Sequence, residues 1–243
     1  MMADKTALAY WFRRIEAAGL PVPRTRIVKM PDAAIKAVWG WFDGLDNGDA
    51  KPFLDELARE AAEIGYPCFL RTDYTSGKHE WGRTCYLTKP EDIPSHVFAI
   101  AEYSETRSMM GELPWDTWAV REFLPTIPLG ICPRYGNVPV CREFRAFVHG
   151  AKVLCLHQYW PVKALIEGGL KGPVLDDLLP RLDVKPEEEV ILLRLAATVG
   201  KVLGGSWSVD ILETARGWYV ADMAEAHKSW HSPGCPHAEK KNA

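Results

Sequence analysis

The sequence lacks three features that would each assign it to a class. It has no run of about 18 apolar residues, so no membrane-spanning helix is expected. Lys and Arg number 29 against 32 Asp and Glu, a net charge of −3, which argues against binding nucleic acid through a bulk basic field. The first ten residues are polar and mixed, unlike a secretory signal. We therefore expect a cytoplasmic protein without a membrane or nucleic-acid partner.

Cysteine is also sparse. The 243 residues include six Cys, and no two of them form a CxxC pair. Several lie in apolar runs typical of strands, where a free Cys behaves as a small hydrophobe. In a chain of this length no disulfide framework is expected.

Aromatic and apolar residues, in contrast, are plentiful. The chain is 47% hydrophobic and has ten Trp, so it can bury a large core. Rings in such number indicate either an aromatic-rich core, the simpler interpretation, or a pocket that stacks planar ligands. The length suits one large domain or two small lobes.

The apolar periodicity predicts helices and strands in mixed order. We expect helices at residues 4–18, 32–42, 53–64, 95–104 and 187–203. We expect strands at 25–28, 67–72, 84–87, 118–124, 143–148, 153–158, 208–213 and 218–222. Residues 165–184, with two Gly-rich turns, are expected to be irregular, as an insertion or a lid. Antiparallel hairpins interleaved with helices indicate the α+β class rather than a doubly wound parallel sheet.

A cation at the end of one predicted strand leads into a loop of small and polar residues. Arg71 ends the strand, and Thr75-Ser76-Gly77-Lys78 follow. Backbone amides, hydroxyls and two cations together suit the oxygens of a polyphosphate. The spacing is not that of a Walker A motif, because a second strand rather than a helix follows. A plain solvated hairpin loop explains the same residues.

Two other predicted strands carry weaker signals. The strand that ends in Glu122–Leu124 can offer backbone groups to an adenine edge, although a half-buried strand stopped by Pro125 explains it equally well. Arg142 and Arg145 lie in the next long strand, where an arginine suits bidentate binding of phosphate or carboxylate. A surface ion pair is the alternative for these arginines.

The acidic residues near the C-terminus are the most informative. Asp210 and Asp222 lie among apolar neighbours on two predicted paired strands, and Glu225 follows. Buried carboxylates are costly unless they are paired or bound to a metal. Converging carboxylates at a phosphate site supply the oxygen ligands that Mg²⁺ requires. Alternatively, the two acids cap strand ends and contact water.

The last segment carries four nitrogen or sulfur donors within eleven residues: His227, His231, Cys235 and His237. Such donors can hold zinc. Their spacing matches no standard zinc finger, and only one of them is a thiol. A flexible polar tail is the favoured interpretation.

Taken in order, these segments resemble an ATP-grasp protein, from Gly19-Leu20-Pro21-Val22-Pro23 to about residue 231. No single motif is specific, but the order and spacing are. The resemblance implies two α+β lobes with antiparallel sheets and ATP between them. We therefore expect lobes at residues 1–117 and 118–231, followed by a polar tail at 232–243.

The resemblance also implies roles for individual residues. The position of Arg71 is that of a strand cation that contacts the α- and β-phosphates, and Arg145 matches a cation near the transferred phosphoryl group. Arg142 and Lys78 join Arg145 as candidate catalytic cations. ATP-binding residues are then Arg71, Thr75, Ser76, Gly77, Lys78, Glu122, Phe123 and Leu124. The implied Mg²⁺ ligands are Asp210 and Asp222, with Glu225 as a further candidate.

Three departures from the family pattern affect these roles. Arg71 stands where the family usually has Lys, which resembles a divergent clade that includes a eukaryotic translation-initiation assembly factor with phage and bacterial relatives. Ala224 replaces the usual Asn two residues beyond the second acid, so a metal ligand is missing unless Glu225 replaces it. Only about 18 residues precede the opening segment, where many ATP-grasp ligases carry a further domain.

The resemblance implies an ATP- and Mg²⁺-dependent carboxylate–amine ligase that acts through an acyl-phosphate. The carboxylate and amine substrates are unknown, and a peptide or a protein is one candidate. The departures favour an alternative, an ATP-binding assembly or chaperone-like module for a protein partner with little turnover. A small-molecule kinase on the same scaffold is the third hypothesis.

Overall fold

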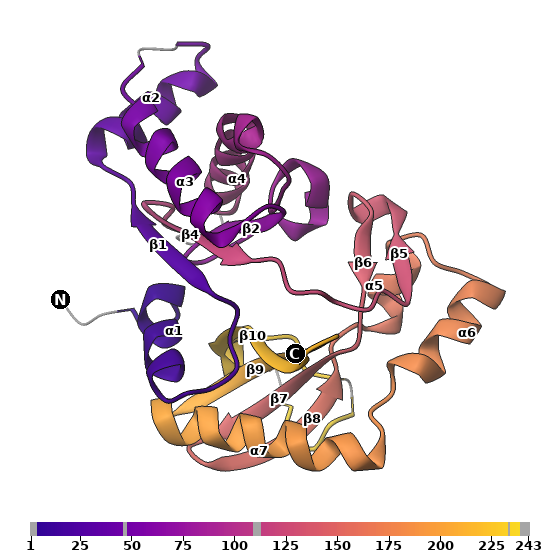
Figure 1. Cartoon of the computed structure of the whole chain (residues 1–243). Coiled ribbons are helices and arrows are strands. Elements are labelled where there is room, and N and C mark those ends of the chain that lie inside the picture. The colour runs from indigo at the N-terminus through magenta and orange to yellow at the C-terminus, as the bar shows by residue number, and fades with distance from the viewer. Residues whose placement is uncertain (1–3, 46–47, 109–112, 233, 239–243) are drawn as a thin grey trace. The chain divides into compact units, whose positions relative to one another are not determined.

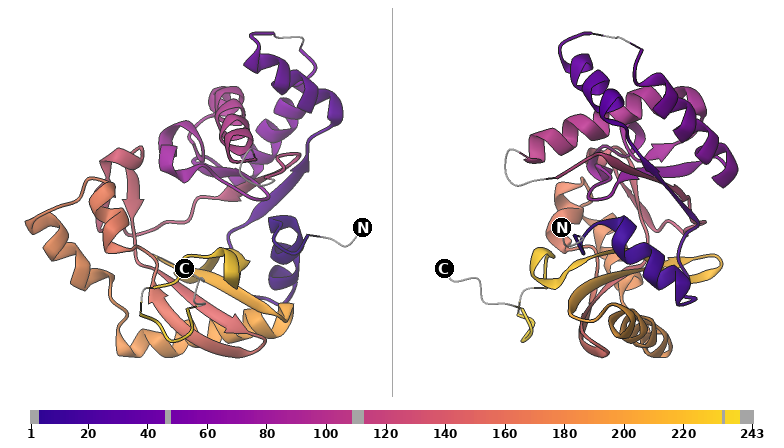
Figure 2. Two further views of the ribbon diagram at one scale, coloured as in Figure 1. Left: turned by 180° about the vertical axis from the view of Figure 1, so that it is seen from behind. Right: turned by 90° about the vertical axis from the view of Figure 1, so that its left-hand side faces the viewer.

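A computed structural model describes residues 4–45, 48–108, 113–232 and 234–238, and the chain divides into two compact units. The first unit combines the chain up to Val22 with Leu124–Pro133 and the chain from Pro139 onward. The second unit consists of Pro23–Phe123 and Arg134–Val138. This division differs from the expected lobes, because helix α1 (Leu8–Ala17) packs against helix α7 (Pro186–Leu203) of the C-terminal part (Figure 2).

The second unit is built on a four-stranded antiparallel sheet. Its order is β1 (Thr25–Lys29), β4 (Thr117–Glu122), β2 (Cys68–Thr72) and β3 (Tyr86–Leu87). Helices α3 (Lys51–Ile64) and α4 (Ile93–Ser108) pack on one face, and α2 (Asp32–Phe42) packs against α4 (Figure 1). Alternate strand residues enter this core, among them Val28, Leu70, Trp118 and Val120.

The first unit also has a four-stranded antiparallel sheet. Its order is β10 (Gly217–Glu225), β9 (Ser206–Thr214), β7 (Glu143–His149) and β8 (Lys152–Gln158). Helix α7 packs along one face of it (Figure 1). Phe144, Ala146 and Val148 of β7 are buried on that face, so the intervening Arg145 lies on the opposite face, which α7 does not cover. We call this opposite face the open face.

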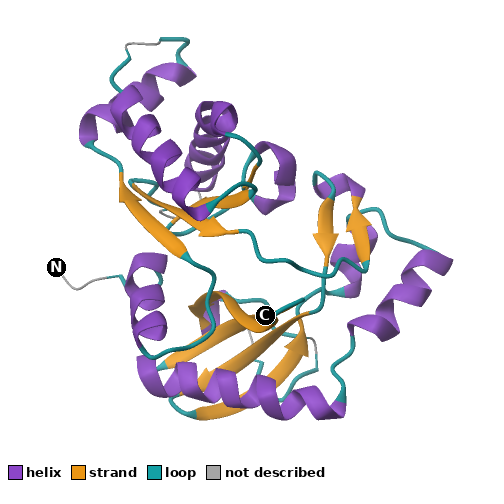
Figure 3. Ribbon diagram, in the orientation of Figure 1, coloured by secondary structure: helices purple, strands orange, loops and turns teal. Residues whose placement is uncertain are grey.

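The prediction of an irregular stretch at 165–184 was wrong. Helices α5 (Val162–Glu167) and α6 (Pro173–Leu182) lie there (Figure 3). Pro173 occupies the first turn of α6, where no backbone N–H is needed, so the Gly172-Pro173 pair starts a helix rather than breaking one. The structure also has a short pair of strands, β5 (Gly130–Cys132) and β6 (Val138–Val140), that the periodicity did not predict.

Helix α7, the longest among the described residues, is amphipathic. Its first turn carries Glu187, Glu188 and Glu189, which suit the positive end of the helix dipole. Leu192, Ala196 and Val199 form its buried stripe. In the part of the chain that the structure describes, no helix combines the length and the apolar content that crossing a bilayer requires.

Gly200 allows α7 to approach the turn between β7 and β8. A Cβ atom at Gly200 would lie 1.9 Å from the carbonyl oxygen of Gly150 in that turn. We therefore expect Gly200→Ala to lower the free energy of unfolding by about 1–3 kcal/mol, because backbone atoms must move apart. Denaturant unfolding measures the change.

The matched control is Gly40→Ala in α2, where the nearest atom to the added Cβ is 3.5 Å away. That variant should be unchanged or more stable by up to about 1 kcal/mol, since Ala favours a helix over Gly. Equal stability of the two variants would contradict the close-approach explanation.

Candidate functional site

Four polar residues form a row across the open face of the first unit's sheet. They are direct partners on neighbouring antiparallel strands, and such partners share a face of the sheet. The row therefore combines an imidazole, a guanidinium and two carboxylates. Its members are His157 on β8, Arg145 on β7, Asp210 on β9 and Asp222 on β10.

Arg145 and Asp210 form a two-pronged ion pair. Arg145 Nε donates to Asp210 Oδ1 at 2.7 Å, and Nη2 donates to Oδ2 at 2.8 Å. The exposed fractions of the two side chains are 15% and 8%, so solvent screens the pair weakly. Burial by itself lowers the pKa of Arg145, but the charge and hydrogen bonds of Asp210 outweigh burial and raise that pKa. Arg145 thus stays charged and fixes the Asp210 carboxylate.

Asp222 faces Asp210 from the next strand. The register shifts between Val220 and Asp222, and this bulge determines which side chains of β10 face the open side. Asp222 Oδ1 accepts a hydrogen bond from its neighbour Met223 N at 2.9 Å. Two carboxylates directly opposite each other repel, so the pair favours a cation beside it. Their oxygens suit Mg²⁺, which commonly takes one or two carboxylates together with substrate phosphates.

The structure does not bring Glu225 to this pair. Glu225 is the register partner of Trp207, whereas Asp210 and Asp222 alternate with that position and lie on the other face. Its Oε2 lies 3.4 Å from Lys228 Nζ and 4.0 Å from His227 Nε2.

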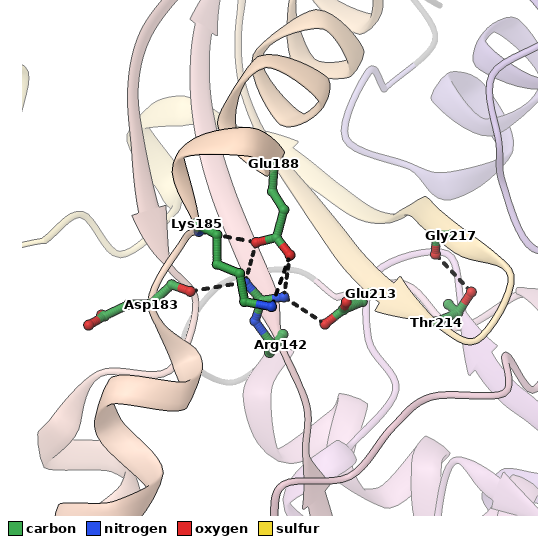
Figure 4. Close-up of polar contacts among 7 residues, drawn as sticks. All are labelled: Arg142, Asp183, Lys185, Glu188, Glu213, Thr214 and Gly217. Atoms are coloured by element: carbon green, nitrogen blue, oxygen red, sulfur yellow. Dashed lines mark hydrogen bonds and ion pairs between the residues drawn. The ribbon is translucent and has the colours of Figure 1, made fainter.

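Arg142 lies just before β7 in a separate buried network (Figure 4). Its Nη1 donates to Glu188 Oε1 at 2.8 Å and to Glu213 Oε2 at 2.9 Å, and its Nη2 donates to the Asp183 carbonyl at 2.9 Å. The Arg142 hydrogen bonds are the main cause that lowers the pKa of Glu188 to about 2. The network ties the first turn of α7 to β7 and β9.

In the second unit, Arg71 lies on β2 and is buried. Its neighbour Leu70 enters the helical core, so alternation places Arg71 on the other face of the sheet. Its Nε donates to the Thr72 carbonyl at 3.0 Å. Arg121 of β4 is also buried and donates from Nε to Thr25 Oγ1 at 3.2 Å.

The loop after Arg71 is a tight turn held by threonines. Thr72 N donates to the Thr75 carbonyl at 2.8 Å, and Thr72 Oγ1 accepts from Thr75 N at 3.1 Å. Gly77 has φ +61°, the left-handed region that favours glycine, and its carbonyl accepts from Thr84 Oγ1 at 2.9 Å. Lys78 then begins a short 3₁₀ helix, Lys78–Arg83. The hairpin is thus confirmed, with a helical turn inside the predicted loop.

The predicted hinge Glu122–Leu124 spans Phe123, the last residue of the longer segment of the second unit. Glu122 pairs with Cys68 in register, and its Oε2 accepts from Arg24 N at 3.3 Å. The Phe123 ring contacts Tyr86 and Trp81, with ring centres 5.0 and 6.0 Å apart.

The described part of the C-terminal tail crosses the open face and is not a free segment. Ser229 Oγ hydrogen-bonds Ser208 Oγ of β9. The Trp230 carbonyl accepts from Arg145 Nη1 at 3.4 Å. The His231 ring stacks on Phe147 of β7 at 3.8 Å, with 5° between the planes.

The tail contacts two strand residues that the sequence reasoning did not select, Cys155 and His157 of β8. The signal that was overlooked is the Cys-x-His spacing, which places both side chains on one face of a strand.

Comparison with known proteins rests on structure alone, because no family model and no curated protein matches the sequence. Cdc123 from Schizosaccharomyces pombe is similar to 91% of this chain and 83% of its own, with 11% identity and a TM-score of 0.55. A C-terminally truncated form of it matches with 12% identity, a TM-score of 0.55, and coverage of 90% and 82%.

A RimK domain ATP-grasp protein from Sphaerobacter thermophilus is also similar, with 18% identity and a TM-score of 0.45. The match covers 91% of this chain but only 60% of that protein.

The likeness to Cdc123, an ATP-grasp protein, extends over nearly the whole chain. At such low sequence identity this likeness concerns the fold alone. The likeness agrees with two units that each have an antiparallel sheet with helices packed on it. The chain has the α+β fold of the ATP-grasp proteins, as the sequence predicted.

Proposed function

We propose that the protein is an ATP- and Mg²⁺-dependent ligase that joins a carboxylate to an amine through an acyl-phosphate. The observation that carries this proposal is the Arg145–Asp210–Asp222 part of the row on the open face. A fixed guanidinium beside two opposed carboxylates suits a site that handles both a phosphoryl group and its metal ion.

The residues divide into two proposed roles. Arg71 and the threonine-held turn bind the phosphates of ATP, and the hinge at Glu122–Leu124 binds its adenine. The turn contributes Thr75, Ser76, Gly77 and Lys78. Asp210 and Asp222 hold Mg²⁺, which, when bound, neutralises charge on the phosphates. Glu225 stays a prediction, with less support because it lies on the other face.

The proposed chemistry needs no nucleophilic side chain. An oxygen of the substrate carboxylate attacks the γ-phosphorus, the bond to the β,γ-bridging oxygen breaks, and ADP leaves. The amine nitrogen then attacks the acyl carbon, phosphate leaves, and the amine proton passes to solvent. Lys78 and Arg145 stabilise the charge on the transferred group. Arg142 is a positioning residue in this proposal, since its network holds the start of the strand that carries Arg145.

A second candidate function is the ATP-binding assembly module. Two observations favour it: Ala224 supplies no ligand atom where the family has an amide, and both Asp210 oxygens accept from Arg145. Such a protein would bind ATP and Mg²⁺ without turnover that depends on an acceptor.

Product analysis separates the candidates. We expect the full chain, given ATP, Mg²⁺ and pools of carboxylates and amines that include peptides, to release ADP and phosphate in equal amounts. Mass spectrometry should find a conjugate lighter by one water than its two substrates. ADP with a phosphorylated product and no free phosphate would indicate the kinase instead.

Thermal unfolding with ATP and Mg²⁺ is the companion measurement. A ligand at 100 times its Kd stabilises the folded state by about 2.7 kcal/mol. Stabilisation without any ADP release would support the assembly module. Absence of stabilisation at millimolar ATP–Mg²⁺ would contradict both ATP-dependent functions.

A further inference from the structure

Four nitrogen and sulfur donors meet at the edge of the first unit's sheet, on the open face. Cys155 and His157 come from β8, and His231 and Cys235 come from the tail. One ligand atom from each lies within 4.8 Å of those of the other three. Cys155 Sγ is 3.1 Å from His231 Nε2, although the residues are 76 positions apart in the chain.

We propose that these four side chains bind one zinc ion in a closed, tetrahedral Cys₂His₂ site. Zinc bonds are about 2.3 Å to sulfur and 2.0–2.1 Å to nitrogen, so the corners of such a tetrahedron lie about 3.3–3.8 Å apart. The observed spread therefore needs only a small contraction. Two thiols and two imidazoles with no carboxylate exclude Mg²⁺ and Ca²⁺ as the preferred ion.

The fold presents the donors from two fixed elements. Residues two apart on a strand share a face, so Cys155 and His157 both point toward the tail. The stack of His231 on Phe147 fixes the orientation of that ring. Gly234, with φ +81°, makes the turn just before Cys235.

The common alternative to a zinc site is a group of core side chains whose polar atoms hydrogen-bond within the protein. His157 does not fit this alternative. Its Nε2 is buried and has no hydrogen-bond partner among the described residues. A buried imidazole nitrogen that lacks a hydrogen-bond partner and lies beside two thiols is what a metal ion completes.

Charge and protons balance when zinc binds. Each thiol loses its proton to solvent, and the two thiolates neutralise the charge of Zn²⁺. The site also has an approach route, because His157 lines a pocket of about 620 Å³ together with Gln158, Trp160 and Trp230.

The ion would fasten the tail across the open face. Before the tail reaches His231, its Ser229 hydrogen-bonds Ser208 of β9. The Trp230 carbonyl then accepts a hydrogen bond from Arg145. Metal binding would therefore order the segment that contacts Arg145. The proposal does not depend on the ligase chemistry.

Metal analysis tests the site. The full chain, made with zinc in the medium, purified without a metal-affinity column and dialysed against zinc-free buffer, should retain one zinc per chain. Cys155→Ser and Cys235→Ser should each lose most of it. His227→Gln is the matched control, since this tail histidine lies outside the cluster and should retain one equivalent.

Cobalt provides a readout that misfolding does not imitate. Co²⁺ added to the apoprotein should produce the intense visible bands and thiolate charge-transfer absorption of a tetrahedral sulfur-ligated site. Cys235→Ser removes only a tail ligand, and it should lose most of the charge-transfer absorption while keeping the far-UV circular dichroism of the folded chain. Wild type that fails to retain zinc or bind Co²⁺ when reduced would overturn the proposal, as would unchanged zinc in the two cysteine variants.

Discussion

Asp222→Asn is expected to reduce acceptor-dependent ATP turnover by about 10²–10³-fold, the usual effect of removing one electrostatic stabiliser from an active site. The free energy of unfolding should change little or rise slightly, because the substitution relieves repulsion with Asp210, its register partner. The measurement is the rate of ADP release over a range of Mg²⁺ concentrations, with unfolding followed in parallel.

Two other acids make this test specific. Asp177→Asn removes an exposed carboxylate of α6 that pairs with Arg181, and it should leave turnover unchanged. Glu225→Gln decides whether Glu225 is a ligand. Since Glu225 lies on the other face of β10, we expect an effect well below that of Asp222→Asn. Full turnover in Asp222→Asn would contradict the metal assignment.

If the protein binds ATP without turnover, the same variant still gives a result. Stabilisation by ATP should then depend on Mg²⁺ in the wild type and lose that dependence in Asp222→Asn. An identical Mg²⁺-dependent stabilisation in both proteins would reject Asp222 as a ligand under either function.

Arg142→Met is expected to lower the free energy of unfolding by about 3–5 kcal/mol, the range for removing one partner of a buried ion pair. The Arg142 side chain is 7% exposed, and its loss leaves Glu188 and Glu213 without their main cation. Urea unfolding of the isolated protein measures the change. Arg181→Met, which breaks an exposed pair on α6, is the control and should cost less than about 0.5 kcal/mol. Equal stability of the two variants would show that the network contributes little.

The same network predicts a pH dependence. The pKa of Glu188 is about 2 in the folded protein and near 4.5 when unfolded, because Arg142 hydrogen-bonds its carboxylate. Its stabilising contribution is therefore complete above about pH 5 and is lost as the pH falls toward 2. The stability difference between wild type and Glu188→Gln should narrow over that interval. A difference that stays constant from pH 7 to pH 3 would contradict the assigned cause.

Local patterns in the sequence predicted most of the elements. Leu57, Ala61 and Ile64 have helical spacing, and α3 forms there. The turn at 215–217 aligns β9 with β10, so the facing of Asp210 and Asp222 follows from a local hairpin. The stretch at 165–184 was mistaken because Gly and Pro both end helices and begin them, and only packing decides between the two. The three-residue strands β5 and β6 are too short for periodicity to detect.

The combinations of site residues that the sequence did not predict depend on pairing between segments far apart in the chain. Arg145 meets Asp210 only because β7 pairs with β9, although β8 comes between these two strands in the sequence. Cys155 and His157 meet the tail for a similar reason, since β8 is the edge strand that the tail reaches. Nothing local in either segment indicates its partner. Candidate residues were therefore identified more readily than their combinations.

The discontinuity of the first unit has a consequence for biosynthesis. Helix α1 is made before its packing partner α7, which ends at Leu203, so at ~5–20 residues per second α1 waits about 10–40 s on the ribosome. Meanwhile the four-stranded sheet of the second unit and its helices α2, α3 and α4 are complete once Phe123 has been made. During that wait the apolar stripe of α1, which includes Trp11 and Phe12, has no partner to cover it. The nascent chain thus exposes an apolar helical segment of the kind that holding chaperones bind.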